Sequence, residues 1–445
     1  MSNAPNGPAI APDDSVDVRF TYSVVASALH DANAVDELTA PIQSSMNELG
    51  GCRTQVGERA TPDGGRPHVL LVATGGTEHA LLDEAAFRRN PVRGQPVLLI
   101  AHGAHNSLPA ALETLGALQQ AGRRGRIVYL SGDESDRRAL DEAISDLEAI
   151  VRLHNTRLGL IGGSSSWLVA STPDIAVVER RWGPHLEIVD SNRLVELTRS
   201  VPVELATTSA SRFTSTAEEA ATTVTTRDVV DASAITTAMQ HLIASDELDA
   251  VSVRCFDLLD DPGTSGCLAL ATLNDDGVVA GCEGDLPSTL AMLLVRHLLG
   301  QPAWMANPAQ VDVAGNRLVL AHCTVAPSMV NGFALSTHFE SGKGVGVSGR
   351  FEEQPVTLLR IGGRDLDKHW VAEGRIIGTG DDPDLCRTQV TIELDVGSVS
   401  ELLDRPLGNH LVLALGCHAE RLDRWMDLAI ADSPAPCRGR DARAD

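Results

Sequence analysis

Two carboxylates lie between a short apolar stretch and the start of a helix. Residues 277–285 have the sequence GVVAGCEGD, which predicts a strand and a turn, and residues 287–300 have helical spacing. Asp285 is placed to cap this helix. Glu283 is not needed as a cap, and it follows the predicted strand at its carboxyl end, where ligands bind in open α/β sheets. Glu283 is therefore a candidate binding or catalytic residue, whereas Asp285 could be a cap alone or a second acid or base.

Histidines in two distant segments offer further donor atoms. His322 lies in the apolar stretch LAHCTV, and His410 lies in a GNH turn far downstream. Oxygen and imidazole donors from distant segments are typical of sites for Mn²⁺, Mg²⁺ or a similar cation, whereas cysteine-rich spacing would indicate zinc. A histidine in a strand can instead be a hydrogen-bonded core residue, and no spacing rule brings Glu283 and His410 together. A metal site and structural histidines are both open interpretations of these residues.

The elements that precede and carry Glu283 form two α/β stretches. Fully apolar strands alternate with amphipathic segments such as the predicted helix over 135–152, which is typical of a parallel sheet covered on both faces. Residues 207–237 are rich in Thr, Ser and Ala and could be a linker, but we favour helices there. The predicted strands occupy 68–76, 96–103 and 126–133 in the first stretch and 157–163, 186–190 and 250–256 in the second.

The pattern changes beyond Gly300. Short segments with turn residues between them, several with alternating apolar positions, predict an antiparallel sheet or small β-barrel, followed by a last helix over 419–430. The fold class is thus α/β, with two Rossmann-like doubly wound domains followed by a β-barrel-like C-terminal domain. The predicted segments are 317–325, 344–351, 355–363, 370–378, 388–395 and 409–416. The predicted boundaries are 1–15 for a disordered tail, 16–155 and 156–300 for the Rossmann-like domains, 301–432 for the β domain and 433–445 for a polar tail.

The composition excludes several classes of partner and location. A chain of 445 residues exceeds what one hydrophobic core usually organises, so we expect two or three domains. The 36 basic and 60 acidic side chains give a formal charge of -24, which argues against nucleic acid and anionic membranes as partners. No apolar run reaches the roughly 18 residues of a membrane span. Met1–Val16 lacks the features of an export signal, so we expect a cytoplasmic protein.

The eight cysteines are widely spaced and include no CxxC pair, which disfavours a zinc knuckle and a disulfide framework. Four of them concentrate near the proposed site, and we interpret them as buried thiols. These four are Cys255, Cys267, Cys282 and Cys323.

Several long motifs, in order along the chain, resemble the L-fucose isomerase and L-arabinose isomerase superfamily, and most of all its shorter, fucose-isomerase-like branch. The likeness extends from about residue 65 to residue 430. In the N-terminal part the motifs are Thr74–Glu78 and His105–Glu113. In the rest of the chain they are Leu160–Ser171, Arg254–Leu259, Gly263–Leu294, Met305–Pro308, Ala321–Val325, His338–Gly349 and Leu407–His410.

The resemblance implies an aldose–ketose isomerase that uses a divalent metal, usually Mn²⁺. It also implies a homo-oligomer, a trimer or hexamer, whose clefts are completed by a neighbouring subunit. Glu283 and His410 match two of the metal ligands of fucose isomerases, and the position of the third ligand, an Asp in the family, is Asn307. His322 lies where the arabinose isomerase pattern places another metal-site histidine.

Asn307 matters because isomerisation moves a proton between adjacent carbons through an enediol. An asparagine can give an oxygen to a hard cation but cannot accept that proton. If the reaction is isomerisation, we expect Glu283 or Asp285 to carry more of the base function, or His322 to join them.

Three other residues are expected near the sugar. Trp167 follows a Gly- and Ser-rich turn and could present its indole to the C–H face of a sugar, in this or an adjacent subunit, or could be a core residue. The turn lacks GxGxxG spacing and a following Lys, so nucleotide binding is not favoured. His338 and Glu340 are the candidate substrate-binding residues of the HFESG segment, although Glu340 could equally be a surface acid.

These observations predict a metal-dependent isomerase that acts on a free aldose or deoxy-sugar. Asn307 keeps open a related enzyme that catalyses epimerisation, dehydration or C–C cleavage on a sugar-derived metabolite. A sugar-binding protein without turnover is the third hypothesis, although it would not need the donors Glu283 and His410.

Overall fold

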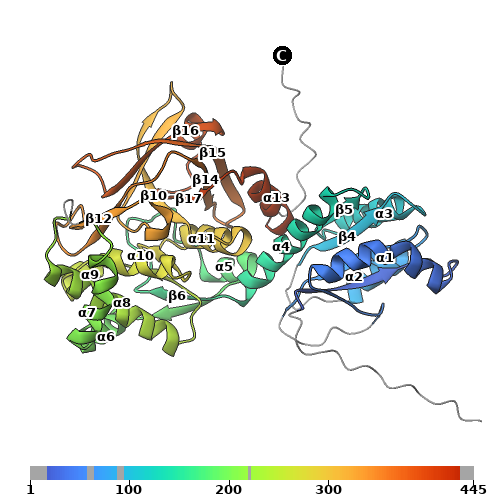
Figure 1. Cartoon of the computed structure of the whole chain (residues 1–445), viewed down its shortest axis with the longest axis horizontal. Helices are drawn as coiled ribbons and strands as arrows, with labels where there is room; N and C mark the ends of the chain where they lie inside the picture. Colours follow the sequence, from blue (N-terminus) through green and yellow to red (C-terminus); the bar gives the residue numbers. More distant parts are fainter. Residues whose placement is uncertain (1–17, 58–64, 88–94, 219–221, 431–445) are drawn as a thin grey trace, which may run out of the picture. The chain divides into compact units, whose positions relative to one another are not determined.

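The computed structural model describes residues 18–57, 65–87, 95–218 and 222–430 (Figure 1). Contacts divide the chain into two compact units, Met1–Glu148 and Ala149–Asp445. The tails predicted over 1–15 and 433–445 lie outside the described residues. The predicted fold class is confirmed, because two separate parallel sheets are followed by a closed antiparallel barrel.

The first unit contains a five-stranded parallel sheet in the order β2-β1-β3-β4-β5. The apolar runs predicted as strands form β3, β4 and β5. The residues of β3 and β4 are fully buried because helices cover the sheet, whereas β5 at its edge is only partly buried. The sequence analysis did not single out β1, α1 and β2. The elements are β1 Phe20–Val25, α1 Ala32–Glu48, β2 Gly51–Arg53, β3 His68–Val72, α2 Glu78–Phe87, β4 Val97–His102, α3 Ser107–Gln120, β5 Gly125–Leu130 and most of α4 Ser135–Asn155, whose last residues, from Ala149, belong to the second unit.

The second unit begins with a four-stranded parallel sheet in the order β7-β6-β8-β9. As we expected, helices occupy most of the described part of residues 207–237, in α7 and α8, while 215–218 and 222–225 between them are not helical. The elements are β6 Arg157–Ile161, α5 Ile175–Trp182, β7 His185–Val189, α6 Ser191–Ser200, α7 Val203–Thr214, α8 Thr226–Ser245, β8 Ala250–Val253, α9 Asp257–Asp260, α10 Cys267–Asp275, β9 Val279–Cys282 and α11 Leu286–Leu299.

Six strands of the same unit close into an antiparallel barrel in the order β10-β11-β16-β15-β14-β17. Its apolar interior belongs to one core with residues of α7, α8 and α10. The segment 344–351, which we grouped with the antiparallel sheet, instead gives β13, which pairs only with β12 outside the barrel. The elements are β10 Trp304–Asp312, β11 Arg317–His322, a 3-10 turn Pro327–Met329, β12 Phe333–Ser336, β13 Gly346–Gly349, β14 Pro355–Gly362, β15 Lys368–Thr379, β16 Thr388–Val396, α12 Val399–Asp404, β17 Leu411–Leu415 and α13 Ala419–Ala429.

Helix α11 connects the parallel sheet to the barrel within the second unit. It contacts β8 and β9 of the sheet and also β10, β14 and β17 of the barrel. Asp285 caps the helix by accepting a hydrogen bond from the Ser288 amide, and Gly300 ends it with φ 70°, in the left-handed region. The N-terminus of α11 therefore brings the carboxyl end of β9 against the barrel.

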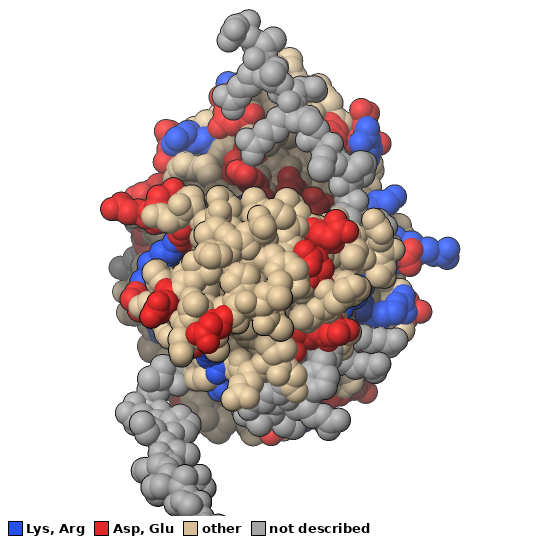
Figure 2. All heavy atoms as spheres, turned by 90° about the vertical axis from the view of Figure 1, so that its right-hand side faces the viewer, with Lys and Arg blue, Asp and Glu red and all other residues tan. Residues whose placement is uncertain are grey.

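One face of the molecule agrees with the acidic composition. On the face drawn in Figure 2, Asp and Glu side chains surround a largely uncharged centre, and the Lys and Arg side chains on that face are scattered rather than gathered into a basic patch. Within the described residues, no helix is both long enough and apolar enough to cross a membrane.

Candidate metal centre

A strained turn between β9 and α11 presents Glu283. The backbone φ of Glu283 is 62°, in the left-handed region that a residue with a Cβ rarely adopts, and Gly284 follows with φ 69°. A Cβ on Gly284 would lie 2.2 Å from the carbonyl oxygen of Gly163, so only glycine fits there. The Glu283 carbonyl accepts a hydrogen bond from the Ser165 amide at 2.9 Å. The loop after β6 thus fixes the turn that carries Glu283.

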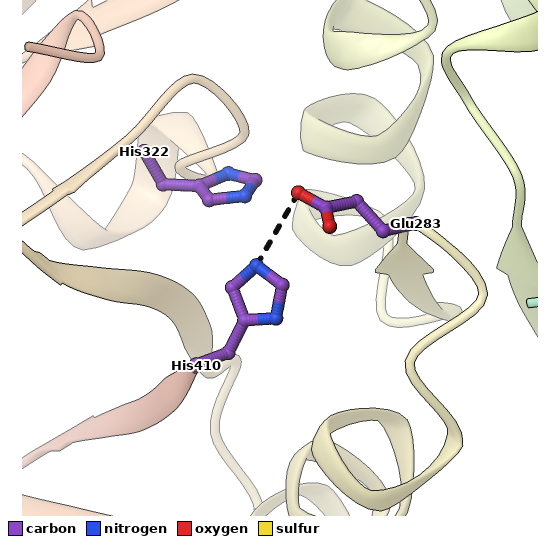
Figure 3. A group of neighbouring side chains, drawn as sticks. All are labelled: Glu283, His322 and His410. Atoms are coloured by element: carbon purple, nitrogen blue, oxygen red, sulfur yellow. Dashed lines mark ion pairs between the residues drawn. The ribbon is translucent and has the colours of Figure 1, made fainter. Parts of the chain in front are cut away.

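Three side chains from separate elements meet at this turn. Glu283, His322 and His410 are all buried, and each offers one potential ligand atom within 4.8 Å of the other two. His410 Nε2 lies 3.4 Å from Glu283 Oε1, and the two imidazole rings are 5.6 Å apart between centroids. Figure 3 shows the three side chains pointing toward one another. The structure therefore brings together Glu283 and His410, which no spacing rule could connect.

The register of the barrel explains why the two histidines and Asn307 share one end of it. Asn307 on β10 pairs with Ala321, the neighbour of His322 at the end of β11. On the other side of β10, Ala306 pairs with Leu411, which directly follows His410. Strand pairing alone thus places all three residues at the end of the barrel that α11 approaches.

His322 is held as a neutral imidazole. Its Nδ1 lies 2.9 Å from Thr324 Oγ1, and burial, with a contribution from His410, lowers its pKa to about 4. If Nδ1 donates to the hydroxyl, Nε2 is the ring nitrogen that can bind a metal ion.

His410 is placed between two carboxylates. Its Nδ1 lies 2.9 Å from Asp285 Oδ2, while its Nε2 faces Glu283. Burial alone would lower the pKa of His410, but its hydrogen bond to Asp285 and the neighbouring carboxylate of Glu283 raise it to about 9. A cation bound at Nε2 would have to displace a proton from this ring.

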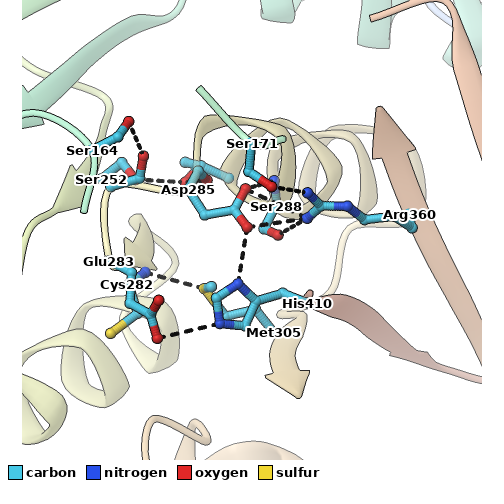
Figure 4. A network of polar contacts seen from close by, with 12 residues as sticks. Ser164, Ser171, Ser252, Cys282, Glu283, Asp285, Ser288, Met305, Arg360 and His410 are labelled. Atoms are coloured by element: carbon cyan, nitrogen blue, oxygen red, sulfur yellow. Dashed lines mark hydrogen bonds and ion pairs between the residues drawn. The ribbon is translucent and has the colours of Figure 1, made fainter. Parts of the chain in front are cut away.

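Asp285 is held from behind by Arg360, a fully buried arginine of β14. Arg360 Nη1 lies 3.1 Å from Asp285 Oδ2 and 2.5 Å from Ser288 Oγ, and its Nη2 lies 2.6 Å from Ser171 Oγ. Figure 4 shows this network, which runs from Arg360 through Asp285 to His410. Burial would raise the pKa of Asp285, but Arg360 and His410 hold it well below its usual range.

The contacts of Asp285 differ from the expectation that it takes part in proton transfer. Its side chain is fully buried and bonds to Ser288, Arg360 and His410. The described residues that line the pocket at Glu283 do not include it. A carboxylate in these contacts orients His410, and a role of Asp285 in proton transfer stays a prediction.

The pocket beside Glu283 contains most of the other candidate residues. Asn307, His338 and Glu340 line it together with Glu283 and His322. The remaining described residues of its lining are Phe256, Cys267, Cys282, Cys323 and Cys386. The lining includes two carboxylates but, among the described residues, no Lys or Arg.

Trp167 contacts the centre through Glu283. The indole Nε1 donates a hydrogen bond to Glu283 Oε2 at 2.6 Å, and the side chain is 49% exposed. Its ring meets Phe256 edge-on at 4.9 Å between centroids, and Phe256 in turn meets His338 at 5.3 Å. Trp167 is therefore not a core residue, and an aromatic row leads from it to the pocket.

The residues of this centre that the sequence analysis missed include Phe256 and Arg360. Phe256 lies within the motif Arg254–Leu259, but nothing distinguished it from its neighbours there. Arg360 had a distinguishing signal, because it is the only charged residue in the strand PVTLLRIG, where a buried arginine needs a partner.

The chemistry of the donors fits a divalent cation. One carboxylate and two imidazoles, with the amide oxygen of Asn307 in the same pocket, are oxygen and nitrogen ligands that suit Mn²⁺ and related ions. Burial would raise the pKa of Glu283, but the neighbouring His410 and the hydrogen bond from Trp167 outweigh that effect and lower it. Glu283 is thus ionised and ready to bind a cation.

Comparison with known proteins supports a sugar isomerase family at low identity. The chain is 24% identical over 272 residues to the sulfoquinovose isomerase of Alkalicoccus urumqiensis, a match that covers 58% of this chain and 59% of that protein. It is 30% identical over 125 residues to that of Priestia aryabhattai (27% and 28%), and 24% identical over 228 residues to that of Clostridium sp. (strain MSTE9) (50% of each). The match thus spans at most 59% of the length of these relatives. No protein-family model matches the chain.

Proposed function

We propose that this protein is an aldose–ketose isomerase that depends on a divalent metal, with Mn²⁺ as the preferred ion. The observation that carries the proposal is the convergence of Glu283, His322 and His410 on one point, where Glu283 and His322 also line a pocket. The relatives named sulfoquinovose isomerase support a sugar substrate. When bound, the metal would polarise the carbonyl and the adjacent hydroxyl of the sugar.

The residues of the chain divide the remaining tasks. Glu283, His322 and His410 hold the ion, and Asn307 adds an amide oxygen at the same end of the barrel. Proton transfer between C1 and C2 needs a base, and the pocket offers the carboxylates of Glu283 and Glu340. His338 and Glu340 bind substrate hydroxyls, and Trp167 packs on the sugar and orients Glu283.

The substrate we propose is a free aldose or deoxy-sugar whose C1–C2 end enters this pocket. The described lining has no cation for an acidic group, so a substituent at C6, such as the sulfonate of sulfoquinovose, would extend beyond the pocket. We also propose a cytoplasmic homo-oligomer, a trimer or hexamer, because the described cysteines are free thiols and the resemblance implies subunits that complete one another's clefts.

A panel assay in deuterated water tests the proposed reaction. Mn²⁺-loaded protein is incubated with glucose-type aldoses, 6-deoxyaldoses, sulfoquinovose and the corresponding ketoses, and the products are followed by NMR. Isomerisation predicts ketose formation with deuterium at C1 or C2. Conversion of one aldose to another without ketose, loss of water or chain cleavage would replace the proposal with the second candidate function, a related reaction on a sugar-derived metabolite.

Asn307 favours that second candidate, because an amide stands where the resembled family has a carboxylate. Removal of the metal with a chelator distinguishes a protein that only binds sugars from an isomerase. The protein that only binds sugars would keep its sugar affinity after the metal is removed, whereas a metal-dependent isomerase would lose turnover.

A further inference from the structure

Two buried cysteines lie in direct contact beside the metal centre. Cys255 follows β8 and Cys282 ends β9, two parallel neighbours whose register pairs Val253 with Cys282. The Cys255 amide donates to the Val253 carbonyl at 2.8 Å, and this tight turn directs the Cys255 side chain back toward β9. The two Sγ atoms are 2.8 Å apart, and both residues are less than 7% exposed.

This thiol pair has no role in the metal centre described above. Both cysteines are free thiols, and the candidate metal ligands are a carboxylate and two imidazoles. A disulfide needs an S–S separation of about 2.05 Å, so the two sulfurs would have to approach by less than about 1 Å. A small rotation of the side chains is enough, without displacement of either strand.

The two sulfurs differ in their access to small molecules. Cys282 lines the pocket that contains Glu283, whereas Cys255 is not among the described residues of its lining. Of these two sulfurs, a small oxidant that enters the pocket would thus meet that of Cys282 before that of Cys255.

We propose that Cys255 and Cys282 form an oxidation site that closes as a disulfide when hydrogen peroxide enters the pocket. In the first step the Cys282 sulfur displaces water from peroxide and becomes a sulfenic acid. In the second step the Cys255 sulfur attacks that sulfur and releases a second water. Overall, two thiols and one peroxide give one disulfide and two waters.

The disulfide has a consequence for the neighbouring Glu283. Cys282 directly precedes Glu283, whose left-handed φ of 62° and hydrogen bond to Ser165 leave the turn little freedom. A rotation of Cys282 toward Cys255 shifts the peptide that carries the Glu283 carboxylate. We expect at least a tenfold weaker affinity for Mn²⁺ in the oxidised protein, a consequence that rests on the proposed metal site, whereas the disulfide itself does not.

Peroxide treatment followed by mass spectrometry tests the site. Full-length reduced protein is treated with hydrogen peroxide and digested at aspartates, which separates Asp249–Phe256 from Asp276–Gly284 and from the peptide that contains Cys267. The proposal predicts a disulfide cross-link between Asp249–Phe256 and Asp276–Gly284 and a loss of two thiols per chain. Dithiothreitol should break the cross-link and restore both thiols. C255A and C282A should each abolish the cross-link, and the exposed-residue control C417A should retain it.

Several outcomes would overturn the proposal. A cross-link of either cysteine to Cys267 or Cys323 would exclude the pair as a disulfide site. A stable addition of two oxygens to Cys282 would exclude it too, as would thiols of Cys255 and Cys282 that remain intact after treatment. Mn²⁺ affinity is measured on the same samples by calorimetry. Unchanged affinity in cross-linked protein would refute the effect on Glu283, and absence of Mn²⁺ binding in reduced protein would refute the proposed function while the cross-link result stands.

Discussion

His410 Nδ1 lies 2.9 Å from Asp285 Oδ2, and neither side chain is exposed. Because Asp285 is held in turn by Arg360, the orientation of His410 is set by residues of α11 and β14 that do not line the pocket. The hydrogen bond at Nδ1 fixes the ring of His410 so that its Nε2 faces Glu283. Carboxylates orient metal-binding histidines in the same way. The precision of the candidate metal centre thus depends on a buried ion pair behind it.

Replacement of Arg360 tests this dependence. R360M leaves Asp285 buried without its cationic partner, so we expect the free energy of unfolding to fall by about 3–5 kcal/mol. Denaturant unfolding measures the loss. The control R350M removes an exposed ion pair with Glu218 and should cost less than about 1 kcal/mol. Equal losses in the two variants would show that Arg360 does not stabilise Asp285.

Trp167 should affect metal affinity although it binds no metal. W167F keeps a ring against Phe256 but removes the hydrogen bond to Glu283 Oε2, so we expect roughly tenfold weaker Mn²⁺ binding. Calorimetric titration measures the change. V169A, in the same loop and 88% exposed, is the matched control and should bind Mn²⁺ as the wild type does. Unchanged affinity in W167F would assign Trp167 to the substrate alone.

A variant with an added negative charge tests whether the side chain of Asn307 faces the metal ion. N307D places a carboxylate at the end of the barrel that carries His322 and His410, so we expect roughly tenfold tighter Mn²⁺ binding. Q310E adds the same charge at the exposed end of the same strand and should leave the affinity unchanged. If N307D binds Mn²⁺ no better than Q310E does, the side chain of Asn307 does not face the ion.

His297 of α11 should make stability depend on pH. Burial, together with the charges of Arg152 and Arg296, lowers its pKa from 6.5 to about 4, and its Nε2 lies 3.3 Å from Thr156 Oγ1. Between pH 6.5 and pH 4 the unfolded chain binds a proton that the folded chain does not, so stability falls as pH decreases through this window and is unaffected above it.

The variant H297Q should remove part of this pH dependence. Relative to pH 7, the wild type should lose on the order of 2 kcal/mol more than H297Q at pH 4.5, measured by chemical denaturation at each pH. H241Q removes an exposed histidine and should follow the wild-type curve. Identical curves for H297Q and the wild type would exclude His297 as the source.

Much of the fold could be predicted because its signals are local. The apolar runs that became β3, β4, β6 and β8, and the cap of α11 at Asp285, depend on adjacent residues alone. Strand partners depend on distant residues, so the alternation in 344–351 did not reveal that β13 pairs with β12 rather than with the barrel.

The candidate site, like the fold, could be predicted where its signals are local and not where they depend on distant residues. The turn of Glu283 was predicted from its place after a strand, and the histidines were proposed first as possible cation donors and then, more specifically, from a family resemblance. That Asp285 faces His410 rather than the pocket follows from Arg360, which lies 75 residues further along the chain. No pattern within one strand or helix contains that contact.

The most direct test of the metal centre is a Mn²⁺ titration of chelator-treated protein, with bound ion and ketose formation measured in the same samples. The account predicts one Mn²⁺ per chain, no turnover before Mn²⁺ is added, and recovery of turnover in proportion to bound ion. E283Q should remain folded but bind Mn²⁺ at least a hundredfold more weakly and form no ketose. Full turnover without metal, or wild-type affinity in E283Q, would contradict the assignment of Glu283, His322 and His410 as the centre of the reaction.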